Sequence, residues 1–240
     1  MENCFLKLLK STLSTVLNLF FPPVCAACHK RLDSTEKFLC ANCDSLVQSD
    51  QPGDCPKCGS KMKDGVCPTC REAKFCFEFA RSALKYKYPL PEIVHNLKYY
   101  GMRSAGTWLA ERMAQAAASY SRFEEYSEVV PVPLHKVRLR ERGFNQSALI
   151  ARGLAKQLGK NYLNCVSRKR YTKSQTTLSR TDRLTNLGGA FKVKNPSMVR
   201  GKKVILVDDV FTTGSTLNEV SRALYEAGAA KVAGYTATRA

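Results

Sequence analysis

Four Cys-x-x-Cys pairs follow one another in the first third of the chain, and they constrain the fold more than any other feature. The pairs are Cys25/Cys28, Cys40/Cys43, Cys55/Cys58 and Cys67/Cys70. A structural zinc ion takes four ligands in a tetrahedron, and a short turn that offers two sulfurs supplies half of such a site. Eight sulfurs therefore predict two structural zinc ions whose coordination positions are all filled.

The sequence leaves the combination of these pairs open. Sequential pairing joins neighbouring pairs around each ion, whereas a cross-braced arrangement alternates them. Sequential pairing is favoured because its internal spacers, 11 and 8 residues long, cost little entropy to close. His29 directly follows Cys28 and is an alternative ligand, although a solvated loop histidine is commoner. Disulfides do not suit a reducing compartment, and iron–sulfur clusters require other spacings.

Residues 1–24 predict an amphipathic helix. Its apolar residues recur at helical spacing, and Pro22 and Pro23 end the pattern. Lys7 and Lys10 interrupt the apolar run, which is shorter than the ~20 residues that cross a membrane. We expect this helix to pack on a neighbouring surface, and a helix at the membrane surface is the alternative. Without a cleavage site for export, a cytoplasmic location with reduced thiols is expected, and the periphery of the inner membrane is the alternative.

Basic residues are concentrated in one segment. Residues 129–203 contain 18 of the 38 Lys and Arg residues but only two of the 20 acidic ones. This concentration indicates a polyanionic partner, either a nucleic acid or a small molecule with several phosphates. A solubilising surface is the alternative interpretation.

A strand, a turn and a helix are expected near the carboxyl terminus. Residues 203–207 form an apolar run typical of a buried parallel strand, Asp208 and Asp209 follow it, and a helical pattern runs from Leu217 to Gly228. The intervening turn is rich in hydroxyls: Thr212, Thr213, Gly214, Ser215 and Thr216. Free N–H groups at the start of a helix bind phosphate, and carboxylates accept hydrogen bonds from sugar hydroxyls or lie beside Mg²⁺.

This stretch, VILVDDVFTTGST, resembles the ligand motif of the type I phosphoribosyltransferases. The resemblance implies that Asp208 and Asp209 contact the ribose of phosphoribosyl diphosphate, in the presence of Mg²⁺, and that residues 212–216 hold its 5′-phosphate. Purine-salvage members have an aspartate where Thr212 stands. This departure counts against purine salvage and leaves no evident general base in the turn.

A basic segment follows a second expected strand. Residues 129–133 read as that strand, 134–146 as a basic loop after it, and Asn145 as the N-cap of a helix that stops at Gly159. In a parallel sheet this loop lies on the same rim as the hydroxyl-rich turn, where Lys136 and Arg138 would meet a diphosphate. A polar stretch at 173–186 is expected to be a mobile cover.

Together these segments resemble the ComF family of competence-associated proteins. They are the cysteine-rich module, PVPLHKVRLRERGFNQ, Gln-Thr-x-Leu-(x)4-Arg-x-x-Asn and VILVDDVFTTGST. The resemblance implies a role in natural transformation, in which single-stranded DNA is taken up, alongside other DNA-uptake proteins at the inner membrane. It does not identify a reaction, because the acceptor substrate of the family is unclear.

We therefore expect an α/β protein with an open, mostly parallel sheet, divided into a helix (1–24), a double Cys4 zinc module (25–75) and a phosphoribosyltransferase-like domain (76–240). One hypothesis is a DNA-uptake protein whose basic residues follow the phosphates, while aromatics such as Phe144 or Tyr171 stack on bases or, alternatively, pack in the core. The alternative is an active Mg²⁺-dependent phosphoribosyltransferase of unknown acceptor. The candidate DNA-binding residues are Arg140, Arg142, Lys169, Arg170, Lys173, Arg180 and Arg183.

Overall fold

A parallel β-sheet forms the centre of the molecule. The computed structural model describes residues 22–51, 53–169 and 189–240. Five strands are arranged in the order β1-β7-β6-β2-β3, and every neighbouring pair in this sheet is parallel. Their bounds are β1 Phe79–Lys85, β2 Glu128–Pro131, β3 Asn161–Tyr162, β6 Lys203–Phe211 and β7 Lys231–Arg239. The expected α/β class with a parallel sheet is confirmed.

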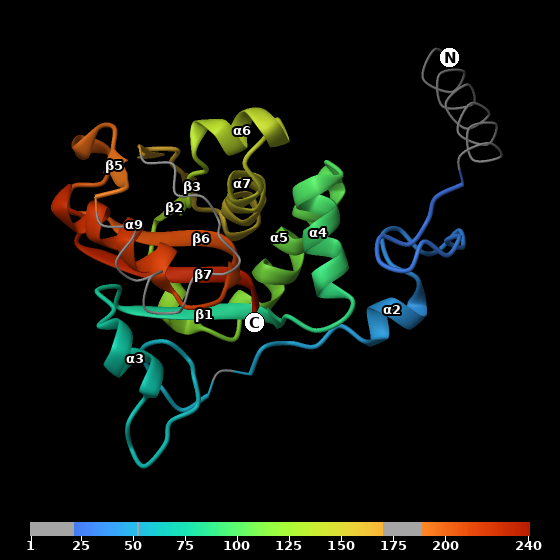
Figure 1. Cartoon of the computed structure of the whole chain (residues 1–240), viewed down its shortest axis with the longest axis horizontal. Helices are drawn as coiled ribbons and strands as arrows, with labels where there is room; N and C mark the ends of the chain where they lie inside the picture. The colour runs from blue at the N-terminus through green and yellow to red at the C-terminus, as the bar shows by residue number, and fades with distance from the viewer. Residues whose placement is uncertain (1–21, 52, 170–188) are drawn as a thin grey trace.

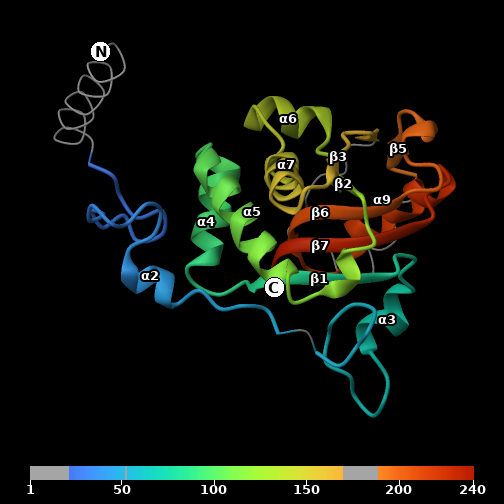
Figure 2. The ribbon, with the colours of Figure 1, turned by 180° about the vertical axis from the view of Figure 1, so that it is seen from behind.

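Helices cover both faces of this sheet (Figures 1 and 2). On one face lie α4 (Leu90–Tyr99), α5 (Arg103–Ala117) and α7 (Gln146–Leu158), with a core that includes Ile150, Ile205 and Tyr235. On the other lie α9 (Ser215–Glu226) and the antiparallel pair of β4 (Val166–Arg168) and β5 (Phe191–Val193). Parallel strands buried on both faces need apolar residues throughout, which explains the continuous run at 204–207.

The remaining elements are short. They are α2 (Ala41–Ser45), α3 (Pro68–Ala73), α6 (Lys136–Arg142) and the 3-10 turns η1 (Ser121–Phe123) and η2 (Pro196–Met198). Among the described residues, no helix combines the length and the apolar character needed to span a membrane.

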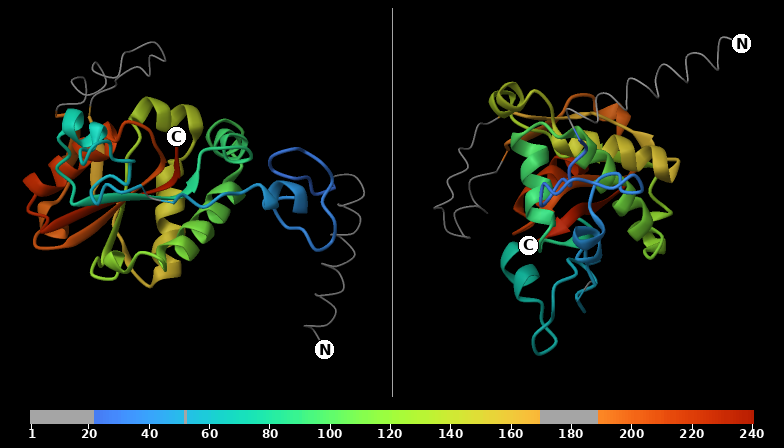
Figure 3. Two further views of the ribbon diagram at one scale, coloured as in Figure 1. Left: turned by 90° about the horizontal axis from the view of Figure 1, so that it is seen from below. Right: turned by 90° about the vertical axis from the view of Figure 1, so that its right-hand side faces the viewer.

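The two cysteine clusters pack on different parts of the α/β unit (Figure 3). Next to the first, Phe38 stacks on Trp108 of α5 at 5.3 Å between ring centroids, and the Asn96 side chain of α4 donates to the carbonyl of Ala26 at 2.7 Å. The second adjoins the opposite core, where Cys76 N–H donates to the Asn218 side chain of α9 at 2.7 Å. Each cluster is therefore attached to a different set of helices.

The structure corrects two local expectations. The basic segment after β2 is not a loop throughout, because residues 136–142 form α6, capped by His135 at its start and by Gly143, with φ of 77°, at its end. The strand expected at 203–207 continues to Phe211, so that Asp208 and Asp209 lie within β6 and not beyond it. Most of the predicted helix at 1–24, and the predicted cover at 173–186, lie outside the described residues.

Candidate functional site

The eight cysteines form two compact groups. Cys25, Cys28, Cys40 and Cys43 make one group, and Cys55, Cys58, Cys67 and Cys70 make the other. Within each group the Sγ atoms all lie within 4.8 Å of one another. The structure thus groups neighbouring pairs, which is the sequential arrangement that short spacers favour, and His29 belongs to neither group.

The chemistry of these groups fits structural zinc. Burial raises the pKa of Cys25, whereas hydrogen bonds from backbone N–H groups, first that of Cys28, lower it, and the resulting pKa is about 6. Burial likewise raises the pKa of Cys55, the hydrogen bond from the N–H of Cys58 lowers it, and the resulting pKa is about 7. The thiolate, which is the form that binds zinc, is therefore promoted at the first sulfur of each group, whereas burial raises the pKa of Cys43, Cys67 and Cys70. Four sulfurs fill a tetrahedral ion, so these sites suit a structural role.

A second candidate site, which we call the 208–216 site, is formed by the end of β6 and the turn into α9. The Asp208 carboxylate accepts a hydrogen bond from the Ser147 hydroxyl of α7 at 2.8 Å and another from the Asp209 N–H at 3.0 Å. Burial, followed by the negative charge of Asp209, raises the pKa of Asp208 to about 7. The neighbouring negative charge and the partly buried position thus make ionisation of Asp208 costly.

Lys98 is the cation that faces this acidic pair. Its Nζ atom lies 2.5 Å from Oδ2 of Asp209, whose side chain is 7% exposed. Burial lowers the pKa of Lys98, but the charge of Asp209, the hydrogen bond to it and the charge of Asp208 together raise this pKa above its usual value. Sequence reasoning did not connect Lys98 with Asp209, because the two residues lie more than 100 positions apart and Lys98 stands at the end of a helix with no motif of its own.

The turn of the 208–216 site is closely packed. Thr213 Oγ1 lies 2.9 Å from Ser215 Oγ, and Gly214 has φ of 76°, in the left-handed region. A Cβ atom on Gly214 would lie 2.8 Å from ring atoms of Phe211 and Phe75. Only glycine fits both requirements. The hollow at this turn is lined by Asp208, Val210, Phe211, Thr212, Gly214, Ser215, Thr216 and Leu217.

Helix α9 begins at Ser215, directly after the turn. The first N–H groups of a helix of this length have no partner within the helix and carry the positive end of its dipole. The turn therefore joins donor groups and hydroxyls on one side to carboxylates on the other, as the binding of a phosphate and of sugar hydroxyls would require.

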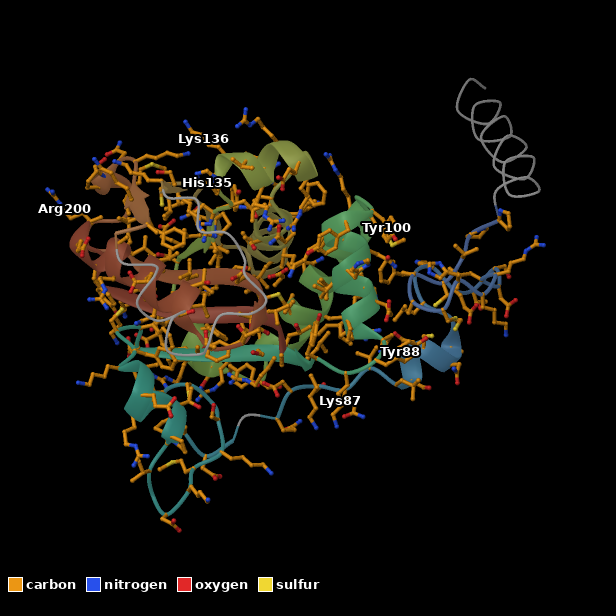
Figure 4. The ribbon with its side chains drawn as sticks, in the orientation of Figure 1. Lys87, Tyr88, Tyr100, His135, Lys136 and Arg200 are labelled. Carbon is orange, nitrogen blue, oxygen red and sulfur yellow. The ribbon has the colours of Figure 1, made fainter. Side chains whose placement is uncertain are left out.

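The basic side chains near the 208–216 site differ in their exposure and in their partners. Lys136 is exposed on α6 (Figure 4), and Arg138 lies 3.7 Å from Glu141. Arg142 is half-buried, and the charge of Asp209 acts on it, opposing the lowering of its pKa by burial. Arg168, which sequence reasoning also missed, is half-buried. Burial lowers its pKa, and the charge of Asp208 opposes this effect.

The other candidate DNA-binding residues are either exposed or outside the described part of the chain. Arg140 and Lys169 are exposed, whereas Arg170, Lys173, Arg180 and Arg183 lie outside the described residues, as does Tyr171. Phe144 is half-buried and packs against the core, with the Arg103 guanidinium 5.3 Å from its ring centroid.

A larger cleft adjoins the 208–216 site. It has a volume of about 600 Å³ and lies between the second cysteine group and the ends of β1 and β7. Thr212 forms part of its wall, together with Lys61, Lys85, Lys87 and Arg239. Arg239 fixes this wall by pairing with Asp50 at 3.2 Å and donating to the Cys58 carbonyl. The cleft is thus lined by four basic side chains, one of which is paired with Asp50.

Two family models match the chain. The model described as phosphoribosyl transferase domain matches residues 145–239, and the model described as double zinc ribbon domain matches residues 16–77. Among solved structures, the allosteric regulatory enzyme of purine biosynthesis aligns with 26% identity over 56% of this chain and 26% of that chain, with a TM-score of 0.40.

Relatives resemble the chain over most of its length. Competence protein F of Haemophilus influenzae is 31% identical over 222 residues, which cover 89% of this chain and 95% of the relative. The DNA utilization protein YhgH of Salmonella typhimurium is 32% identical over 88% of this chain and 94% of the relative. The cysteine groups, the parallel sheet and these alignments agree: the chain belongs to the ComF family of competence-associated, phosphoribosyltransferase-like proteins.

Proposed function

We propose that this protein acts in natural transformation, where it binds single-stranded DNA and a ligand of the phosphoribosyl diphosphate type. The names of its relatives, competence protein F and DNA utilization protein, support the biological role. The two Cys4 groups support a reducing, cytoplasmic location, because their zinc sites need reduced thiols. Other DNA-uptake proteins at the inner membrane are the expected neighbours.

The geometry of the 208–216 site carries the ligand proposal. Asp208 and Asp209 would accept hydrogen bonds from the vicinal hydroxyls of the ribose, and residues 212–216 would bind the 5′-phosphate through hydroxyls and the N–H groups at the start of α9. Mg²⁺, when bound, would neutralise charge on the diphosphate. Lys98 would hold the side chain of Asp209 in place.

Basic side chains near the 208–216 site would bind the remaining phosphates. Lys136 and Arg138 on α6 would meet the diphosphate, and Arg168, on which Asp208 acts electrostatically, would add a guanidinium. Arg140 and Lys169 are exposed and would bind phosphates of a DNA strand, together with Arg142 and the basic residues between 170 and 183.

DNA binding is tested by fluorescence anisotropy with a labelled 20-nucleotide dT strand at increasing salt. We expect the logarithm of the binding constant to fall linearly with the logarithm of salt concentration, by ~0.7 for each phosphate neutralised. The Asp208→Ala/Asp209→Ala variant should retain this binding. Absence of binding by the zinc-loaded wild type would contradict the DNA part of the proposal.

An active Mg²⁺-dependent phosphoribosyltransferase is the second candidate, and the 600 Å³ cleft beside Thr212 favours it. An acceptor held there would lie next to the turn that binds the sugar phosphate. Catalysis would depend on positioning and on charge neutralisation, because no carboxylate stands at position 212 to act as a base. Release of diphosphate from phosphoribosyl diphosphate and Mg²⁺ when nucleobases or nucleotides are added would support this activity, provided that Asp208→Ala/Asp209→Ala abolishes it.

A further inference from the structure

Two tyrosines at the end of α4 are unusually exposed. Tyr99 is 62% and Tyr100 is 76% exposed, the largest values among the exposed large hydrophobic residues of the described chain. They directly follow Lys98, whose ammonium pairs with Asp209. Figure 4 shows Tyr100 on the outer side of α4. A pair of adjacent exposed rings at the edge of a binding site indicates a contact surface.

These rings are held in place by their neighbours. The His95 ring lies one turn earlier on α4, at 4.8 Å from the Tyr99 ring and 5.5 Å from the Tyr100 ring. The Arg142 guanidinium of α6 lies 5.5 Å from the Tyr99 centroid. These contacts restrict the orientations open to the rings, which reduces the side-chain entropy that a stacking ligand would have to overcome. We call His95, Tyr99, Tyr100 and Arg142 the aromatic ridge.

The surface beside the ridge is basic. Helix α6 contributes Arg142 to the ridge and also carries Lys136, Arg138 and Arg140 within its seven residues. Leu139, one turn before Arg142, is 42% exposed and adds apolar surface. Alternation of exposed rings with guanidinium groups suits a chain that has both flat apolar faces and phosphates. Single-stranded nucleic acid has both, whereas the stacked bases of a duplex do not expose their faces.

We propose that the aromatic ridge is a base-stacking platform for single-stranded nucleic acid. This inference rests on the proposed DNA-binding function and assigns it a location. Because Lys98 lies between the ridge and Asp209 in the structure, a strand bound on the ridge would pass beside the 208–216 site. The two tyrosine rings would contact base faces, while Arg142 beside them would contact a phosphate.

The test compares two 20-residue strands with the same number of phosphates, dT20 and an abasic strand, in binding to three zinc-loaded proteins. These are the wild type, Tyr99→Ala/Tyr100→Ala and the control Tyr99→Phe/Tyr100→Phe, which retains both rings. We expect the wild type to bind dT20 at least about fivefold more tightly than the abasic strand, since one stacked base contributes ~1–3 kcal/mol. The alanine variant should lose this preference and the phenylalanine variant should keep it.

The salt dependence separates stacking from charge. Neither substitution removes a charge, so the slope of binding against salt should be the same for all three proteins. A preference for dT20 that survives in the alanine variant would overturn the platform while leaving DNA binding intact. Binding of phosphatidylglycerol vesicles, but not of dT20, that depends on the two tyrosines would assign the ridge to a lipid surface instead. Absence of dT20 binding by the wild type would overturn both this inference and the proposed DNA function.

Discussion

The Cys4 groups and the 208–216 site differ in how their negative charges are compensated. In each Cys4 group four sulfurs surround one position, and a zinc ion there fills its coordination shell with protein ligands. In the 208–216 site Lys98 pairs with Asp209, and burial together with the charge of Asp209 raises the pKa of Asp208 to about 7. The first arrangement is complete with its metal, whereas the second is electrostatically unfavourable until a ligand supplies hydroxyls or a cation.

This difference separates stability from function. Closed metal sites contribute folding free energy and present a surface, whereas a site that retains uncompensated charge reduces stability and gains affinity for a complementary ligand. The comparison predicts that substitutions in the Cys4 groups destabilise the fold, while removal of one carboxylate stabilises it.

The largest effect is expected from the second Cys4 group. Substitution Cys58→Ser should reduce bound zinc from two ions to one per chain and destabilise the domain, since Cys58 is fully buried in the core around Phe75 and Phe77. Metal analysis and thermal unfolding measure both results. The control Cys76→Ala changes a cysteine outside both groups and should retain two zinc ions.

Removal of the cation at the 208–216 site should come next. Substitution Lys98→Met leaves Asp209 buried without its ion pair and should lower the free energy of unfolding by about 3 kcal/mol. Lys98→Arg keeps the charge and should lose less. Chemical denaturation at pH 8 provides the comparison, and equal stability of the wild type and the methionine variant would show that the pair is not important for folding.

Two glycines with similar backbone angles separate steric crowding from backbone strain. Gly214→Ala should cost about 2–3 kcal/mol, because its Cβ would overlap the Phe211 and Phe75 rings in addition to straining the backbone. Gly143→Ala, with φ of 77° and no atom within 4 Å of its Cβ, should cost only about 1 kcal/mol. Similar losses in chemical denaturation would indicate that the turn is not closely packed.

Neutralising one carboxylate should have the smallest effect, and one of opposite sign. The folded state holds a proton on Asp208 up to about pH 7, whereas an ordinary aspartate has a pKa of 3.8, so stability falls as pH rises between these values. Asp208→Asn should therefore raise Tm at pH 8, by roughly 2–4 °C for each kcal/mol recovered. It should have little effect at pH 4, where scanning calorimetry provides the control.

Parts of the fold with local signals were predictable from the sequence. The zinc groups follow from two-residue spacings, and the helix at α7 follows from Asn145, whose side chain accepts from Ser147 N–H at 3.1 Å, and from Gly159 at its end. The strand and turn at 204–216 carry both an apolar run and the hydroxyl-rich motif. These features depend on residues close in sequence.

Features that depend on tertiary contacts were not predictable in this way. The strand β6 extends through the acidic pair because β7 supplies partners for it: Asp208 pairs with Thr236, and the Thr238 hydroxyl donates to the Asp209 carbonyl at 3.2 Å. Lys98 and Arg168 reach the carboxylates from α4 and β4, across the fold. Helix α6 was misread as a loop because its arginines were considered for their charge and not for their good helix propensity.

Calorimetric titration with phosphoribosyl diphosphate and Mg²⁺ tests the central claim most directly, using zinc-loaded wild type and the Asp208→Ala/Asp209→Ala variant. The contrast between closed and open sites predicts that the wild type binds, that the variant retains both zinc ions, and that it loses ligand binding. Absence of binding by the wild type, or equal binding by the two proteins, would contradict the assignment of the 208–216 site.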